Sequence, residues 1–209
     1  MSLMTQRLEA WQKFAPQLEV ADIILTRNEK SIISRSIRAA TKSYWNHAVI
    51  VFSVPDKKTH FNNTLLISAE DHGIEIHRLQ RYTNHFDFVD IGVKRVPGLS
   101  PELRQNVVSY VLNNLDIPYD FTRLLGMLIK FFEQALFHRP GYLKHYLVRQ
   151  DAFICSAFIQ KAFYEVVPPE KKINMILKND FDAMTMLDEV TPADIARSKN
   201  CEWVYNSHD

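Results

Sequence analysis

The spacing of hydrophobic positions changes about halfway along the 209-residue chain. In the first half, short apolar and β-branched runs, some alternating with polar residues, predict strands at 20–26, 45–52, 64–69, 74–79 and 86–96. In the second half, apolar residues recur at helical spacing and predict helices at 101–115, 121–137 and 153–163. Strands followed by helices are typical of an α+β fold with an antiparallel sheet.

Two further amphipathic stretches and several local signals complete the predicted elements. Helices are expected at 6–14 and 31–41, and Gly92 indicates a bulge in its strand. A capping residue followed by proline occurs at Ser100-Pro101 and at Thr191-Pro192, which predicts helix starts there and a short helix over 191–196. We predict an N-terminal helical extension over 1–19 and a single domain over 20–209, with a helical insertion around 121–147.

Charge and composition disfavour several classes of protein. The 25 basic and 24 acidic side chains give a net charge of +1, which argues against a nucleic-acid partner. The 5 glycines form no phosphate-binding loop. No apolar run is long enough to span a bilayer, and the hydrophobic fraction of 46% is sufficient for a sizeable core.

The cysteines and histidines indicate neither a disulfide framework nor a metal site. Cys155 and Cys201 are too few for a framework. The spacing of His72, His77 and His85 matches no common zinc pattern, so we expect no metal and no cofactor. The N-terminus lacks a basic segment followed by an apolar one, so a cytoplasmic location is the default expectation unless a leader has been removed.

Cys155 lies in the first turn of the helix predicted over 153–163. Asp151 stands just before this helix, where an N-cap belongs. Unpaired backbone N–H groups and the positive end of the helix dipole favour a thiolate at such a position. The alternative is a small buried side chain of the core, because free cysteines are among the most buried residues.

A thiolate nucleophile needs a nearby base and a polar group that orients that base. His47 stands where a polar loop enters an apolar strand, and it is the candidate base; the alternative is a core histidine bonded to backbone. On the next strand, Ser68 and Glu70 point to one face, because strand side chains alternate. Either side chain reaches the imidazole if the two strands pair.

Six blocks of residues occur in a fixed order along the chain. The blocks are Asp22-Ile23-Ile24-Leu25, Ser43-x-x-Asn46-His47-Ala48-Val49-Ile50-Val51, Ile67-Ser68-Ala69 with Gly73-Ile74, Pro118-Tyr119-Asp120, Phe153-Ile154-Cys155-Ser156 and Thr191-Pro192-Ala193-Asp194. This is the order seen in the circularly permuted papain-like amidases, and the chain resembles the YiiX/YebB-like branch of the NlpC/P60 superfamily over about residues 20–201. Non-permuted relatives have the cysteine block first, so the order here implies the permuted topology.

The resemblance implies a permuted papain-like fold in which a cysteine-bearing helix packs on the antiparallel sheet. It implies Cys155 as the nucleophile and His47 as general base and then acid. The resemblance puts Tyr119 and Asp120 near the cleft. The alternative is a turn whose tyrosine packs in the core. Asn46, just before His47, and Ser156, just after Cys155, are assigned together with Tyr119 and Asp120 to substrate binding.

Two positions depart from the family pattern. Ser68 stands where the family commonly has glutamate, and Ala157 stands where many members have an acidic residue. Glu70, two residues beyond Ser68 on the same face, is our predicted orienting group, because its charge would hold the imidazole more strongly; Ser68 is the alternative.

The hypothesis is a cysteine amidase or peptidase that acts on an amide or ester of a cell-wall-type peptide or of an N-acyl, lipid-like substrate. The alternative is a weak or inactive member that binds a peptide or acyl ligand in the same cleft. The apolar stretch at 121–137 has three interpretations: a core helix, a cap that accepts an acyl chain, and a helix that makes peripheral contact with a membrane.

Overall fold

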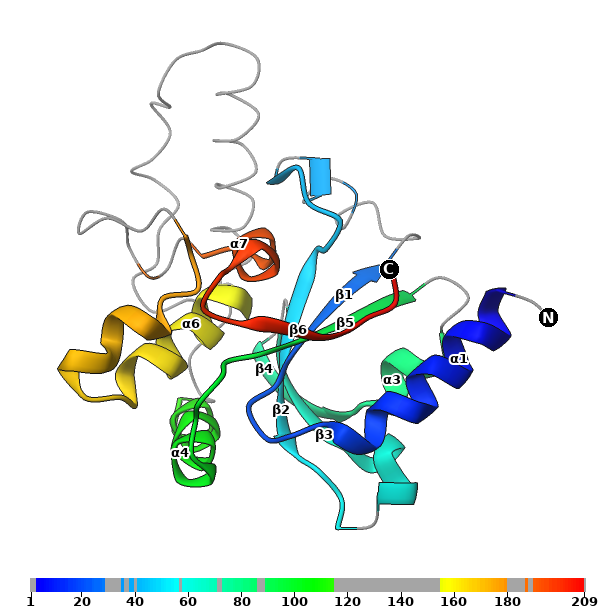
Figure 1. Cartoon of the computed structure of the whole chain (residues 1–209), viewed down its shortest axis with the longest axis horizontal. Helices are drawn as coiled ribbons and strands as arrows, with labels where there is room; N and C mark the ends of the chain where they lie inside the picture. Colours follow the sequence, from blue (N-terminus) through cyan, green and yellow to red (C-terminus); the bar gives the residue numbers. More distant parts are fainter. Residues whose placement is uncertain are drawn as a thin grey trace.

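The computed structural model describes residues 3–28, 35, 38–39, 41–56, 58–70, 73–85, 89–114, 155–179, 187 and 190–208. They contain a six-stranded sheet of order β4-β3-β2-β1-β5-β6, and every neighbouring pair is antiparallel (Figure 1). The strands are β1 (Ile23–Asn28), β2 (His47–Ser53), β3 (Leu65–Glu70), β4 (Gly73–Arg78), β5 (Val89–Arg95) and β6 (Glu202–Asn206). The predicted α+β class with an antiparallel sheet is confirmed.

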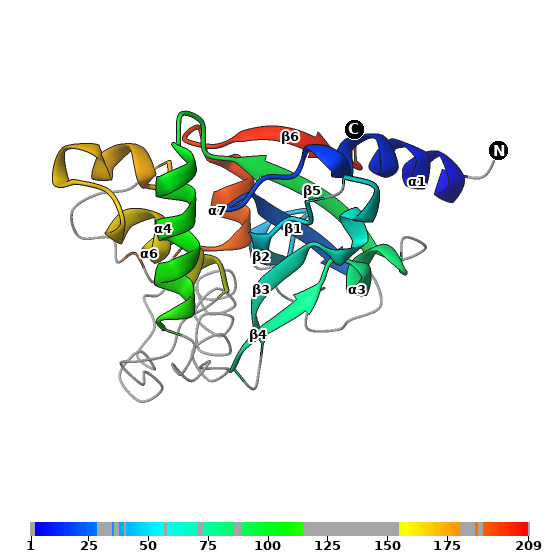
Figure 2. The ribbon, with the colours of Figure 1, turned by 90° about the horizontal axis from the view of Figure 1, so that it is seen from below.

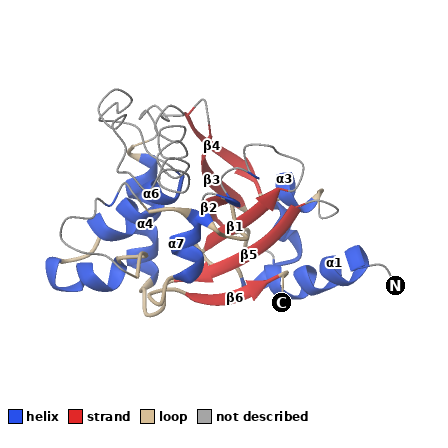
Figure 3. Ribbon diagram, turned by 90° about the horizontal axis from the view of Figure 1, so that it is seen from above, coloured by secondary structure: helices blue, strands red, loops and turns tan. Residues whose placement is uncertain are grey.

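Helices cover both faces of this sheet. They are α1 (Leu3–Phe14), α3 (Gln80–Thr83), α4 (Pro101–Leu112), α6 (Cys155–Glu165) and α7 (Pro192–Arg197), with 3₁₀ segments η1 (Ala15–Gln17), η2 (Lys58–Asn63) and η4 (Pro169–Met175). Figure 3 shows α4, α6 and α7 on one side of the strands and α1 and α3 on the other. None of the helices in the described ranges combines the length and hydrophobicity that a bilayer-spanning segment needs.

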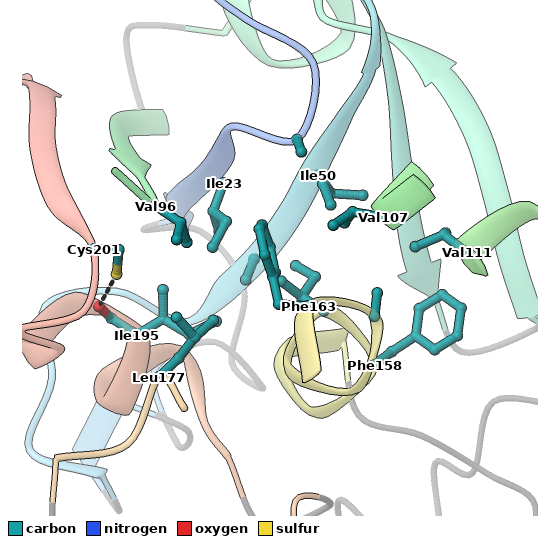
Figure 4. Close-up of a cluster of buried hydrophobic side chains, with 14 of the residues drawn as sticks. Ile23, Ile50, Val96, Val107, Val111, Phe158, Phe163, Leu177, Ile195 and Cys201 are labelled. Atoms are coloured by element: carbon teal, nitrogen blue, oxygen red, sulfur yellow. Dashed lines mark hydrogen bonds between the residues drawn. The ribbon is translucent and has the colours of Figure 1, made fainter. Parts of the chain in front are cut away.

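Alternation along the central strands divides the apolar side chains between two cores. In the first core, Ile50 of β2 packs with Phe158 and Phe163 of α6 (Figure 4). In the second core, the neighbouring Val49 packs in a cluster with Trp11 of α1. Helix α6 therefore packs against the face of β2 and β3, and Cys155 is its first residue.

A buried ion-pair cluster fixes the start of β1. Asp22 is fully buried, and both its carboxylate oxygens accept hydrogen bonds from Arg95 at 2.7 Å. Arg104 of α4 donates to the carbonyl of Val20 at 3.1 Å. Between them, Ala21 has φ 66°, a left-handed conformation that disfavours a side chain. This turn explains why the first strand begins at Ile23 rather than at residue 20.

Gly92 has a different role from the predicted one. The register shift between β5 and β6 lies between Val93 and Lys94. At Gly92 itself, a Cβ would lie 2.7 Å from Trp203 and 2.8 Å from Trp45. The glycine therefore makes room for two tryptophan rings, whose centroids are 5.7 Å apart, on the sheet.

The C-terminal strand β6 and the short helix α3 were not predicted from the sequence. Strand β6 pairs with β5 and forms one edge of the sheet. The helix starts at Pro101 and Pro192 are confirmed, because Ser100 accepts a hydrogen bond from the Leu103 amide and Thr191 accepts one from the Asp194 amide. The helix predicted over 101–115 ends at Leu112. The predicted helix 121–137, the insertion 121–147 and most of 31–41 lie outside the described residues.

Candidate active site

His47 is the first residue of β2, and the chain that leads to it is fixed by hydrogen bonds to β1. The register pairs Thr26 with His47. The side-chain oxygen of the buried Asn46 accepts from the Asn28 amide at 3.0 Å, and the Asn46 amide donates to the Thr26 carbonyl at 3.1 Å. Hydrogen bonds to β1 therefore fix the backbone just before the residue that carries the imidazole. Asn46, which we assigned to substrate binding, contacts β1 through both its side chain and its backbone.

The imidazole meets a serine from the neighbouring strand. His47 Nε2 lies 2.9 Å from the Oγ of Ser68 on β3, and Ser68 is buried. The pairs Ile50↔Ile67 and Val51↔Leu66 fix the register. Counting three residues from the first pair sets His47 opposite Glu70, with Ser68 two residues away on the same face. Of the two orienting groups considered, Ser68 is the one with an observed bond to His47, and the Glu70 side chain lies outside the described residues.

Cys155 opens α6 and is 5% exposed. Burial raises the pKa of its thiol, but the charge of His47 and a hydrogen bond to the His47 side chain lower it, and so do the backbone N–H groups of Ala48 and Ser156. The net result is a pKa below the ordinary value. The structure thus brings Cys155 and His47 into contact, although they are far apart in sequence.

The two backbone amides come from different elements. The Ser156 N–H belongs to the first turn of α6, where backbone donors have no partner within the helix. The Ala48 N–H belongs to β2, and it lies ahead of Ile50, where the pairing of β2 with β3 begins. The helix position was visible in the sequence. The Ala48 amide was missed, because its availability depends on where the strand pairing starts.

Ser156 serves the fold through its side chain. It is fully buried, and its Oγ donates to the carbonyl of Val190 at 2.7 Å. Ala157, the position that departs from the family pattern, is fully buried as well. The backbone amide of Ser156, rather than its hydroxyl, is the group that faces the thiol.

Three residues of the predicted site lie outside the described residues: Tyr119, Asp120 and the predicted cap Asp151. Across the described ranges, no three side chains of the metal-ligating types His, Cys, Asp and Glu come together as a metal site would require.

Comparisons with known proteins identify the family of this chain. Residues 17–125 match the model of the family described as the permuted papain-like amidase enzymes YaeF/YiiX, family C92. The crystal structure of the metalloprotein yiiX from Escherichia coli O157:H7 is similar, with 20% identity, a TM-score of 0.47, and coverage of 91% of this chain and 98% of that chain. A search of curated proteins gave no significant match. Because the family match spans more than half of the 209 residues, this chain belongs to the permuted papain-like amidases.

Proposed function

We propose that this protein is a cysteine hydrolase that cleaves an amide or ester bond through a dyad of Cys155 and His47. One observation carries the proposal: the buried Cys155 thiol, at the start of α6, is hydrogen-bonded to His47 and has a lowered pKa. Burial alone disfavours a thiolate. A thiol that ionises readily beside an imidazole is what a cysteine nucleophile requires.

The reaction follows from the roles of the two side chains. The Cys155 thiolate attacks the carbonyl carbon, and backbone N–H groups at the start of α6 stabilise the oxyanion. The His47 imidazolium then gives its proton to the leaving amine or alcohol as the scissile bond breaks, which leaves a thioester. In the second half, neutral His47 takes a proton from water, and the hydroxide attacks the thioester, which releases the acid and restores the thiolate.

Ser68 is our proposed orienting group. Since Nε2 of His47 is hydrogen-bonded to Ser68, Nδ1 is the nitrogen available to Cys155. In the thiolate–imidazolium pair both ring nitrogens carry protons, so Nε2 donates to the Ser68 oxygen. A serine holds the ring orientation without adding a negative charge. Glu70 remains the alternative from the sequence.

The substrate classes proposed from the family resemblance are cell-wall-type peptides and N-acyl or lipid-like amides and esters. A substrate panel should therefore vary the acyl group from short to long chains and the leaving group from amine to alcohol. Since an acyl-enzyme is an obligatory intermediate, the panel should also be read by intact-protein mass spectrometry.

The test compares Cys155→Ala with Cys201→Ala on the substrate that the unaltered protein turns over fastest. We expect Cys155→Ala to abolish turnover and the acyl adduct while circular dichroism and melting show an intact fold. Cys201→Ala, the matched removal of the other buried thiol, should retain both. Unchanged turnover in Cys155→Ala would overturn the proposal. Binding of a panel member without turnover or adduct in the unaltered protein would instead identify the chain as a binding module.

A further inference from the structure

Lys94 of β5 is a buried cation outside the dyad. Its side chain is 2% exposed, and an ammonium in such a place is strongly unfavourable unless it is hydrogen-bonded. Lys94 Nζ donates to the carbonyls of Ile195, Ala196 and Ser198 at 3.0, 2.9 and 2.9 Å. The three hydrogens of the ammonium thus each have an acceptor at the end of α7 (Pro192–Arg197), where the last carbonyls have no amide partner in the α-helical pattern.

The segment that Lys94 holds also contacts the residue after the nucleophile. Immediately before α7, the Val190 carbonyl accepts the Ser156 hydroxyl at 2.7 Å inside the core. A reciprocal cap of Thr191 and Asp194 then fixes the start of the helix. Helix α7 lies beside α6 and reaches β5 through the Lys94 contacts (Figure 2). A displacement of α7 would therefore shift the first turn of α6, where Cys155 lies.

The C-terminal end of α7 holds the loop that leads to His47. Arg197 donates to the carbonyls of Thr41 and Lys42 at 3.2 and 2.6 Å. Lys42 has φ 48°, a left-handed conformation that is unfavourable for a residue with a side chain and needs support from its surroundings. The carbonyl contacts of Arg197 supply such support, five residues before His47.

We infer that Lys94 is a positioning residue: by anchoring α7 to the sheet, it holds Cys155 and His47 in register with each other. The inference rests on the proposed dyad. The three hydrogen bonds of Lys94 Nζ go to backbone carbonyls of the α7 segment. Its effect passes through the Val190 carbonyl on one side and through Arg197 on the other.

The test measures iodoacetamide alkylation of Cys155 against pH in Lys94→Met and in Arg104→Met. Lys94→Met keeps an unbranched side chain and removes the ammonium. Arg104→Met removes another buried cation, one that contacts Val20 and Glu19 rather than α7. Both variants should be less stable. Only Lys94→Met should raise the apparent pKa of alkylation, by about one unit, which slows alkylation about tenfold at a pH below both values.

A second pair of variants covers the case in which Lys94→Met does not fold. Arg197→Met breaks the link to the Thr41–Lys42 carbonyls, and Lys199→Met removes an exposed cation two residues away. We expect Arg197→Met to raise the apparent pKa and Lys199→Met to leave it unchanged. Equal pH profiles in the unaltered protein, Lys94→Met and Arg197→Met would overturn the inference and leave the dyad standing. An ordinary thiol pKa in the unaltered protein would overturn the dyad, and the inference with it.

Discussion

The two cysteines are similarly buried, but the pKa of the Cys155 thiol is lowered and that of the Cys201 thiol is raised. Cys155 is 5% exposed and Cys201 is 3% exposed, and both are free thiols. Burial raises the pKa of both, and in Cys201 it prevails over the nearby Lys94, so the pKa of that thiol stays above its ordinary value. In Cys155 the His47 side chain and two backbone amides reverse the effect, and the pKa is lowered. Burial therefore does not distinguish a nucleophile from a core thiol.

Two features distinguish the thiols: the His47 side chain beside Cys155, and the backbone groups around each sulfur. Cys155 stands at a helix N-terminus, among N–H donors that stabilise a thiolate. Cys201 stands beyond the C-terminus of α7, where its Sγ donates to the Ile195 carbonyl at 3.6 Å (Figure 4). The Lys94 ammonium near it is hydrogen-bonded to three carbonyls of the same segment. Burial therefore dominates the pKa of the Cys201 thiol, whereas His47 and the backbone amides outweigh burial at Cys155.

Replacing His47 should remove most of this contrast. In the unaltered protein, Cys155 should be alkylated by iodoacetamide at pH 6.5 far faster than Cys201. A thiol of ordinary pKa, about 8.5, is only ~1% ionised at pH 6.5, so His47→Ala should slow Cys155 alkylation about a hundredfold there. Because the folded pKa is lowered, the midpoint of the rate profile should move to higher pH in the variant. Peptide mapping after timed labelling gives both rates.

The Cys201 rate is the internal control of that experiment, and it should be the same in both proteins. Overlapping pH profiles for Cys155 with and without His47 would mean that the helix N-terminus alone sets the thiol pKa, and the dyad would be wrong.

Removing the Ser68 hydroxyl should have a smaller effect. Ser68→Ala deletes one hydrogen bond to His47 Nε2, which is worth about 1 kcal/mol, so kcat/KM should fall about fivefold. The measurement is steady-state turnover of the best panel substrate across pH. Glu70→Gln is the matched change on the same strand face, and we expect it to have less effect than Ser68→Ala. A larger loss in Glu70→Gln would restore Glu70 as the orienting group.

The choice between Ser68 and Glu70 marks the limit of sequence-based prediction here. Alternation along a strand shows that both side chains share a face, and the family resemblance identifies the strand. Which one meets the imidazole depends on the register of β2 and β3, which shifts between Val51 and Ser53, and on the twist of the two strands. Neither quantity leaves a signal in the sequence of one strand.

The pairing of Cys155 with His47, by contrast, was within reach of the sequence. The helical spacing after Cys155, the apolar strand after His47 and the order of the family blocks each predict one part of it, and the structure brings the two side chains together. The role of α7 was not predictable beyond its start at Thr191-Pro192. A lysine within an apolar strand does not reveal that its ammonium will meet three carbonyls about a hundred residues away.

Cys201→Ala should give the smallest effect, and it tests whether the two thiols are independent of each other. It removes a buried sulfur next to Ile195, which leaves a small cavity and lowers the unfolding free energy by about 1 kcal/mol. The variant loses the contacts of the sulfur with Lys94 and the Ile195 carbonyl, but the three carbonyl contacts of Lys94 remain, so α7 should keep its place and Cys155 its pH profile. Denaturant unfolding and Cys155 alkylation in the same variant check both statements. A raised pKa at Cys155 in Cys201→Ala would mean that the sulfur, and not only the ammonium, supports α7, and the two cysteines could no longer be treated as independent.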